Sequence, residues 1–407
     1  DVYMYLTGGQ SKFEFAPTSN EQKEKEDNML SEVEIGCATT NSKYKERMDC
    51  AVVKIPKSSS LSGVFTTNNF KSAPVKNCLK KFSQKMSGEK LLAINAGNAN
   101  AGTGKAGEND LELVLDSIAQ ETGINKKNIF PFSTGVIGER LEIKSITSTF
   151  EKCLKVFKRN NFQGLATSIM TTDKKVKISK TIVKIGNKKF SIIGVAKGVG
   201  MIEPNMATTL SFVFTDLKIS ESTLKKIHKN ICNETFNSIS VDGEQSPSDS
   251  SILVATGKNL IKSPKLLKIF EKSLLKIFTE LSEKLLLDGE GATKLIEIEV
   301  SGLKSKIACK EVAKKIANSP LLKTAAYGED PNWGRILSAA GNTENKFQEK
   351  DVSLKIGKIR VLEKGEIHKK YKESLGKKEF KKKRISLAII LGSSKHSAKV
   401  KSSDLTH

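Results

Sequence analysis

Two adjacent threonines, Thr208 and Thr209, stand near the middle of this 407-residue chain, in a segment of glycines, proline and polar residues. The segment covers residues 194–216, with the sequence GVAKGVGMIEPNMATTLSFVFTD. Apolar, β-branched and aromatic residues on both sides are typical of strands, and Gly186 with Asn187 is suited to a two-residue hairpin turn before it. We therefore expect a polar loop, carrying Lys197 and the threonines, between two core strands.

A threonine hydroxyl needs a base before it can act as a nucleophile, and histidine is the usual base. None of the four histidines of the chain lies in this loop. A threonine that begins a chain can use its own α-amine, whose pKa of about 7.7 to 8.0 lies far below that of lysine. Thr208 would gain such an amine if the Ala207–Thr208 bond were cut. Its own hydroxyl, held against the preceding carbonyl, would favour that cut because pre-oriented groups react at a high effective concentration.

Both self-cleavage and acyl transfer place negative charge on a carbonyl oxygen, which backbone N–H groups stabilise. A short apolar strand ends in the glycine-containing turn STGVIGE at residues 133–139. We expect N–H groups near Thr134 and Gly135 to form this oxyanion hole. A phosphate-binding loop is excluded at residues 95–107, because GxxxxGK[ST] requires Gly and Ser or Thr where the chain has Ala99 and Ala106.

The net charge of +23, from 68 basic and 45 acidic residues, raises the question of a nucleic-acid or membrane partner. Lysines alternate with glutamates, and no aromatic residues interleave a basic stripe, so we expect neither partner. The longest apolar runs are strand-sized. Six cysteines without a CxxC pair indicate reduced thiols and a cytoplasmic protein. No motif indicates a metal or a bound cofactor.

Strand-like and helix-like segments alternate along the chain with several hairpins, which indicates an α+β fold in which sheets and helices form a sandwich. No GxGxxG motif follows a strand, so a doubly wound parallel sheet is not favoured. Residues 1–35 are largely polar and without clear periodicity, and we expect them to form a mobile arm.

Seven phrases of the sequence, taken in order, resemble the ornithine acetyltransferase family of arginine synthesis. They are GVFTTNNFKSAPV (63–75), NAGNANAGTGKAG (95–107), STGVIGE (133–139), IMTTD (169–173), AKGVGMIEPNMAT (196–208), DGEGATK (288–294) and GEDPNWGR (328–335). The resemblance runs from about residue 50 to residue 406. Members of this family are glutamate N-acetyltransferases, and some also use acetyl-CoA.

The resemblance implies a layered α/β/β/α sandwich with a self-cleaving site like that of the N-terminal-nucleophile enzymes. Cleavage between Ala207 and Thr208 would give fragments 36–207 and 208–407, which would assemble as a heterotetramer with two copies of each. Thr208 would carry acetyl from N2-acetyl-L-ornithine to L-glutamate in a ping-pong mechanism, with acetyl-CoA only as a second donor. The residues implied to bind substrate are Thr171, Lys197, Thr208 and Glu290, and the resemblance also implies an oxyanion hole at Thr134 and Gly135.

The sequence departs from the family pattern at three places. Thr209 stands where the family often has Met, the stretch SVDGEQSPSDS (240–250) differs from the family wording, and the chain stops at SSDLTH where the family continues into a tail that helps close the substrate site. Two other hypotheses remain. An N-terminal-nucleophile aminopeptidase or amidase would pass the acyl group to water, and a non-enzymatic basic protein would not cleave itself.

Overall fold

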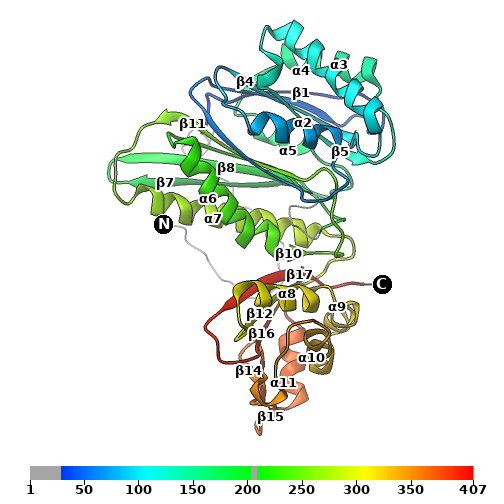
Figure 1. Cartoon of the computed structure of the whole chain (residues 1–407), viewed down its shortest axis with the longest axis vertical. Helices are drawn as coiled ribbons and strands as arrows, with labels where there is room; N and C mark the ends of the chain where they lie inside the picture. Colours follow the sequence, from blue (N-terminus) through cyan, green and yellow to red (C-terminus); the bar gives the residue numbers. More distant parts are fainter. Residues whose placement is uncertain (1–28, 203–208, 407) are drawn as a thin grey trace.

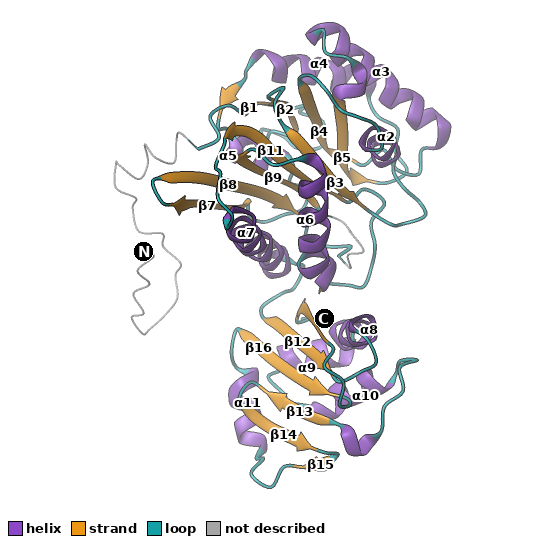
Figure 2. Cartoon of the chain, turned by 60° about the vertical axis from the view of Figure 1, so that its left-hand side comes forward, coloured by secondary structure: helices purple, strands orange, loops and turns teal. Residues whose placement is uncertain are grey.

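The structure is a computed structural model that describes residues 29–202 and 209–406. Two sheets stack face to face between layers of helices, and a third sheet lies beyond them with helices of its own (Figure 1, Figure 2). Both views show the third sheet and its helices as the separate lower part of the molecule.

The first sheet has the strand order β5-β4-β2-β1-β6, with β4 and β5 parallel and the other neighbours antiparallel. Helices α3 and α4 cover its outer face, where side chains such as Val52 and Leu91 pack against Leu115 and Phe150. The strands are β1 (Glu34–Ala38), β2 (Cys50–Ile55), β4 (Lys90–Asn98), β5 (Ile129–Val136) and β6 (Lys158–Arg159). The helices of this part are α2 (Ala73–Phe82), α3 (Gly104–Thr122), α4 (Ile143–Lys155) and α5 (Phe162–Ser168), with the 3-10 turn η1 (Lys126–Asn128).

The second sheet has the order β3-β11-β9-β8-β7 and is covered on its outer face by two long helices. Its strands are β3 (Ser60–Phe65), β7 (Lys177–Ile185), β8 (Lys188–Lys197), β9 (Leu210–Leu217) and β11 (Ser250–Asn259). The covering helices are α6 (Glu221–Glu234) and α7 (Leu266–Asp288). Gly186, at a φ of 58°, closes the predicted hairpin between β7 and β8.

Alternating apolar side chains explain why the two sheets stack. In β9, Phe212 and Phe214 point into the core shared with the first sheet, whereas Val213 packs towards α6 and α7. Ile193 and Ile192 of β8 divide in the same way, since successive residues of a strand face opposite sides. A sheet that is apolar on both faces needs cover on both. The layer order is therefore α/β/β/α, which confirms the predicted α+β sandwich.

The third sheet forms its own core with four helices. Its order is β10-β17-β12-β16-β13-β14-β15. The strands are β10 (Ile239–Ser240), β12 (Leu295–Ser301), β13 (Ser353–Ile356), β14 (Ile359–Glu363), β15 (Glu366–Ile367), β16 (Arg384–Ile390) and β17 (Ser397–Ser403). The helices are α8 (Lys306–Ala317), α9 (Pro320–Tyr327), α10 (Trp333–Gly341) and α11 (Glu373–Phe380), with the 3-10 turns η2 (Phe236–Ser238) and η3 (Glu349–Asp351).

Strand pairs join the chain on the two sides of the predicted cleavage point. The antiparallel pair β8 and β9 connects residues 192–197 to residues 210–215, and β3 pairs with β11. The two predicted fragments therefore share one sheet and one core, so the Ala207–Thr208 bond is not needed to keep them adjacent.

The predicted mobile arm of residues 1–35 is too long at its C-terminal end. Met29, Leu30 and Val33 are buried in the core between the sheets, and β1 already begins at residue 34. Burial of these three apolar side chains favours an ordered segment. The polar residues around them hide this tendency in the sequence. Residues 1–28 lie outside the described part of the chain.

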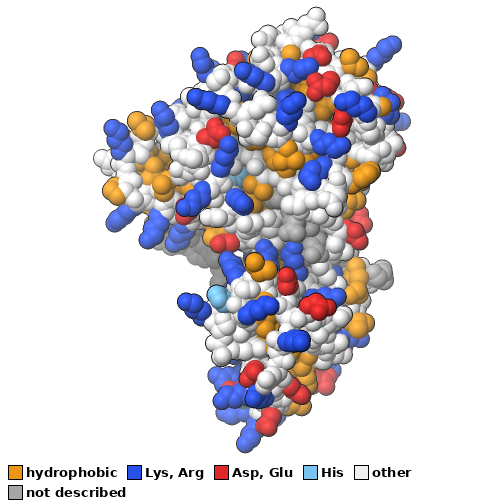
Figure 3. Space-filling model, viewed as in Figure 1, with side chains coloured by type: hydrophobic (Ala, Val, Ile, Leu, Met, Phe, Trp, Pro, Cys, Tyr) orange, Lys and Arg blue, Asp and Glu red, His pale blue; other side chains and the backbone are white. Residues whose placement is uncertain are grey.

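The surface charges match the interpretation drawn from the sequence. On the face shown in Figure 3, Lys and Arg side chains are spread over all parts of the molecule, with Asp and Glu among them. Among the described residues, no helix is both long and apolar enough to cross a membrane.

Candidate active site

A cavity of about 360 Å³ collects the predicted site residues from segments that are far apart in the chain. Thr134 and Gly135 come from the end of β5, and Lys197 is the last residue of β8. Thr171 follows α5, and Glu290 follows α7. All five line this one cavity, which is the arrangement that a shared substrate site requires.

Lys197 and Thr134 are in direct contact in the wall of the cavity. The Lys197 ammonium donates a hydrogen bond of 3.0 Å to the Thr134 hydroxyl, and both side chains are buried. Burial lowers the pKa of Lys197, while the Asp173 and Asp249 carboxylates oppose the shift and Lys177 adds to it. The Lys197 ammonium donates to the Thr134 oxygen and so occupies one of its lone pairs. The Thr134 hydroxyl can therefore donate its own proton to another acceptor in the cavity.

Asp173 fixes two of the segments that line the cavity. One carboxylate oxygen accepts hydrogen bonds from the Lys177 ammonium at 2.5 Å and the Gly198 N–H at 2.8 Å, and the other accepts from the Thr171 N–H at 3.0 Å. Lys177 also contacts the Asp288 carboxylate at 2.6 Å. Burial raises the pKa of Asp173, but the ammonium groups of Lys197 and Lys177 outweigh it and leave that pKa below its ordinary value. Asp173 is therefore a buried anion that holds the Thr171 and Gly198 backbone in place beside the cavity.

Gly135 has a conformation that only glycine adopts without strain. Its φ is 131°, and a Cβ atom built on it would lie 2.3 Å from the carbonyl carbon of Gly97. Gly97 pairs with Gly135 across β4 and β5, next to an irregularity at Asn98. The small residues of the 95–107 loop thus allow the two backbones to approach closely, which presents the end of β5 to the cavity.

The segment between β1 and β2 supplies residues that the sequence analysis missed. Tyr44 lines the cavity, and the Arg47 guanidinium stacks 3.8 Å from the centre of its ring. Arg47 also donates hydrogen bonds to the carbonyl oxygens of Met170 and Thr171, the first at 3.1 Å. Asp173, by contrast, stands inside the phrase IMTTD that the sequence analysis did single out, so the signal for it was present.

Ala207 and Thr208, the predicted cleavage point and nucleophile, lie outside the described residues, but both flanks of their segment are anchored near the cavity. On one side, Val199, Gly200 and Met201 line the cavity, and the N–H groups of Met201 and Ile202 donate to the Asp242 carboxylate at 2.5 and 2.8 Å. On the other side, the Thr209 N–H donates to Asp249 at 2.6 Å.

Asp249 is a fully buried carboxylate beside this second anchor. Its other oxygen, Oδ2, has no hydrogen-bond partner among the described residues, and neither does the buried Thr209 hydroxyl. Burial raises the pKa of Asp249 well above its ordinary value, against the opposing effects of the Thr209 N–H and the Lys197 ammonium. Unpartnered buried polar atoms are rare in native structures, and a catalytic role is one explanation for them. Sequence reasoning did not find Asp249, because it lies in the stretch 240–250 that departs from the family wording.

Within residues 29–202 and 209–406, no group of three or more His, Cys, Asp and Glu side chains is arranged to hold a metal ion. The charged residues that line the cavity are Lys197, which is buried, and Glu290, which is exposed.

A model of the ArgJ family matches residues 34–407. The chain belongs to the ArgJ family. Two relatives, from Bradyrhizobium diazoefficiens and Bartonella henselae, are each named arginine biosynthesis bifunctional protein ArgJ. Both are 37% identical to this chain, over 386 and 382 residues, and the matches cover 93% of the chain and 93% of each relative.

Solved structures that resemble this member of the ArgJ family include the arginine biosynthesis bifunctional protein argJ from Bacillus halodurans. It is 32% identical, with a TM-score of 0.44 over 47% of this chain and 92% of that chain. An ornithine acetyltransferase complexed with ornithine, from Mycobacterium tuberculosis, is 22% identical, with a TM-score of 0.36 over 44% and 95%. The ArgJ assignment confirms the resemblance drawn from the seven phrases, and it identifies the chain as an enzyme.

Proposed function

We propose that this ArgJ protein moves an acetyl group from N2-acetyl-L-ornithine to L-glutamate through an ester on Thr208. The observation that carries the proposal is the convergence of Thr134, Gly135, Thr171, Lys197 and Glu290 on one cavity, between the anchored flanks of the segment that contains Thr208. Relatives named for arginine biosynthesis over nearly their whole length support the substrate class.

The first step of the proposed mechanism is self-cleavage. The Thr208 hydroxyl attacks the Ala207 carbonyl, the acyl group moves from nitrogen to oxygen, and water hydrolyses the ester to leave a free Thr208 α-amine. The N-terminal fragment, with its folded part at 36–207, and fragment 208–407 then stay together through the β8–β9 and β3–β11 pairs. Two of each form a heterotetramer in the cytoplasm. Because Asp249 holds the Thr209 N–H, it fixes the peptide unit that immediately follows the nucleophile.

The second step is acetyl transfer. The Thr208 amine takes the proton of the Thr208 hydroxyl as it attacks the acetyl carbonyl, and the Thr134 hydroxyl and the backbone at Gly135 stabilise the oxyanion. Lys197 directs the Thr134 proton towards that oxyanion by donating to the same oxygen. The Thr208 ammonium gives its proton to the departing nitrogen, so ornithine leaves as the amine. The α-amine of glutamate then attacks the acetyl ester, which forms N-acetylglutamate and returns the proton to the Thr208 oxygen. No bound cofactor takes part, and acetyl-CoA acts only as a second donor.

The charged residues of the cavity match amino-acid substrates. A carboxylate of the substrate pairs with the Lys197 ammonium, and the side-chain ammonium of ornithine pairs with Glu290, an exposed residue of the same cavity. Thr171, held by Asp173, supplies a further polar contact. Both acetyl donor and acceptor carry a carboxylate, so one cation can serve each half of the reaction.

The test begins with the intact mass of the purified protein beside Thr208→Ala and Thr209→Ala variants. We expect two fragments that meet at Ala207 and Thr208 in the parent protein and in Thr209→Ala, and one uncut chain in Thr208→Ala. Cleavage that persists in Thr208→Ala would remove Thr208 as the nucleophile. The cleaved enzyme is then incubated with acetylornithine, once with glutamate and once without it, and the released products are measured. Release of N-acetylglutamate supports the transferase, whereas equal release of free acetate in both cases indicates an amidase.

A further inference from the structure

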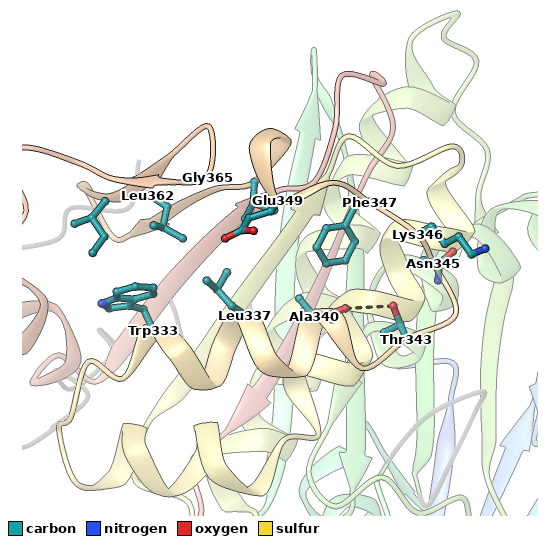
Figure 4. Close-up of a pocket in the computed structure, with 13 residues that line it drawn as sticks. Trp333, Leu337, Ala340, Thr343, Asn345, Lys346, Phe347, Glu349, Leu362 and Gly365 are labelled. Atoms are coloured by element: carbon teal, nitrogen blue, oxygen red, sulfur yellow. Dashed lines mark hydrogen bonds between the residues drawn. The ribbon is translucent and has the colours of Figure 1, made fainter.

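A second cavity, of about 720 Å³, lies in the third-sheet part of the molecule and shares no lining residue with the candidate active site. Figure 4 shows its construction from α10, the segment that follows α10, and the β14–β15 hairpin. We call it the C-terminal groove and define it by Trp333, Leu337, Phe347, Glu349, Leu362 and Ile367. Its volume is in the range typical of sites for small organic molecules.

The walls of the C-terminal groove are largely apolar and incompletely covered. Trp333 and Leu337 are one helical turn apart on α10, and with Phe347 they pack only partly against the core of the third sheet. Ile367 at the rim is 60% exposed. Apolar side chains arranged around a concavity lose contact with water when a ligand with an apolar body fills it, which is the main source of affinity in such sites.

The position of Glu349 is fixed by the hairpin opposite to it. Gly365, at a φ of 81°, approaches so closely that a Cβ atom there would lie 2.7 Å from the Glu349 carbonyl oxygen. The Gly365 N–H also donates to the Val352 carbonyl at 2.8 Å. The short η3 turn that carries Glu349 is therefore clamped to the hairpin, and Figure 4 shows its carboxylate directed into the cavity above Leu337.

Glu349 is the acidic residue among those that line the groove. Its carboxylate makes no hydrogen bond or ion pair with any described residue, although the chain has 23 excess positive charges. The Thr343 hydroxyl donates to the Ala340 carbonyl, and the Asn345 amide donates to Glu311. Lys346 lies at the far end from Trp333 with its ammonium turned away from the cavity (Figure 4).

We propose that the C-terminal groove binds an amphipathic organic cation, whose apolar body lies along Trp333, Leu337 and Leu362 and whose ammonium or guanidinium group meets Glu349. The carboxylate supplies the charge complement, and Trp333 and Leu337 supply the apolar wall. This site is separate from acetyl transfer and does not depend on the proposed reaction.

The chain provides its own reporter for a test, because Trp333 is its only tryptophan. The probes are n-octylammonium, 1-octanol and n-octanoate, which share one apolar body and differ in charge. We expect a saturable change in tryptophan emission and an affinity about two- to fivefold higher for octylammonium than for octanol, the order that an exposed ion pair gives. The excess positive charge of the whole chain favours octanoate, so a preference for the cation reports on the groove itself.

Two variants isolate the carboxylate. In Glu349→Gln, octanol should bind as before while the advantage of octylammonium disappears. Glu344→Gln removes the same charge from the same segment at a residue that does not line the cavity, so it should retain the advantage. Neither change touches the candidate active site, and self-cleavage should be unchanged in both.

Four results would overturn the proposal. The first is the absence of saturable binding by octylammonium. The second is that the parent protein binds octanol or octanoate at least as tightly as octylammonium. The third is emission that changes with protein concentration alone while octylammonium fails to bind, which would indicate that a second copy of the chain covers the groove. A cation preference that survives in Glu349→Gln would remove Glu349 from the site and overturn the proposal as well.

Discussion

The Lys197 ammonium donates a hydrogen bond of 3.0 Å to the Thr134 hydroxyl, although the two residues are 63 positions apart in the chain. This contact joins the end of β8 in the second sheet to the end of β5 in the first sheet. It connects the predicted substrate-binding cation to the predicted oxyanion hole, so a change at either residue should affect both functions.

Thr134→Ala removes the acceptor of the Lys197 hydrogen bond and the hydroxyl proposed to stabilise the oxyanion. We expect acetyl transfer to fall by about 10² to 10³, the usual cost of losing one such donor. Thr134→Ser keeps the hydroxyl and should retain most of the rate. The test is the rate of acetyl transfer by fully cleaved protein. Equal rates for Thr134→Ala and Thr134→Ser would show that the Thr134 hydroxyl has no part in the mechanism.

Gly135→Ala should disrupt the site more than the same change at Gly138. Both glycines have positive φ, at 131° and 87°, so alanine is strained at each by about 1 to 2 kcal/mol. Only at Gly135 would the new Cβ atom also meet backbone, at 2.3 Å from Gly97, whereas nothing lies within 4 Å of it at Gly138. We expect a larger loss of melting temperature and slower self-cleavage for Gly135→Ala. Similar melting temperatures for the two variants would contradict the close approach of β4 and β5 at Gly97 and Gly135.

Lys177→Met should destabilise the fold by about 3 to 5 kcal/mol, because it leaves the buried Asp173 and Asp288 carboxylates without their shared cation. Lys225→Met is a matched control. Lys225 forms an ion pair with Glu221 at the same 2.6 Å as the Lys177–Asp288 pair, but it lies on the surface of α6 and should contribute about 0.3 to 0.5 kcal/mol. Urea unfolding of the two variants gives the comparison, and equal losses would show that burial does not govern the value of these pairs.

Acid should destabilise the protein through His228. This side chain is fully buried between the hydroxyls of Ser62 and Ser251, at 2.9 Å from each, and burial lowers its pKa from 6.5 to about 3. Below pH 6.5 His228 is protonated in the unfolded chain but stays neutral in the folded protein. Its contribution to the free energy of unfolding is therefore present above that pH and is lost as the pH falls. The loss is about 1.4 kcal/mol for each pH unit until the folded pKa is reached.

A His228→Gln variant should therefore show a weaker dependence of its unfolding free energy on pH between about 6 and 4, whatever its stability at neutral pH. His368→Gln, changed at a partly exposed histidine near the β14–β15 hairpin, serves as the control. A parent and a His228→Gln protein with the same slope would show that His228 is not the group that takes up the proton.

The sequence predicted the parts of the fold that depend on neighbours in the chain. The hairpin at Gly186 and the strands β8 and β9 on the two sides of the polar loop follow from local patterns of residue type. It did not predict that Met29, Leu30 and Val33 are buried, because three apolar residues in a polar stretch have no period. Tyr44 and Arg47 were missed for a related reason, since nothing in their own segment indicates that it folds over the cavity.

What the sequence determined by itself is the family and the identity of the chemical groups: a threonine after alanine, a glycine turn, one lysine and one glutamate in phrases that resemble known enzymes. What only the tertiary structure decided is their environment. Lys197, Asp173 and Asp249 look like ordinary charged residues in the sequence, and become buried, mutually dependent groups because strands from both sides of residue 208 share one sheet. Burial and the distances between charges control how these groups titrate and what they can bind, and both arise from contacts between residues far apart in the chain.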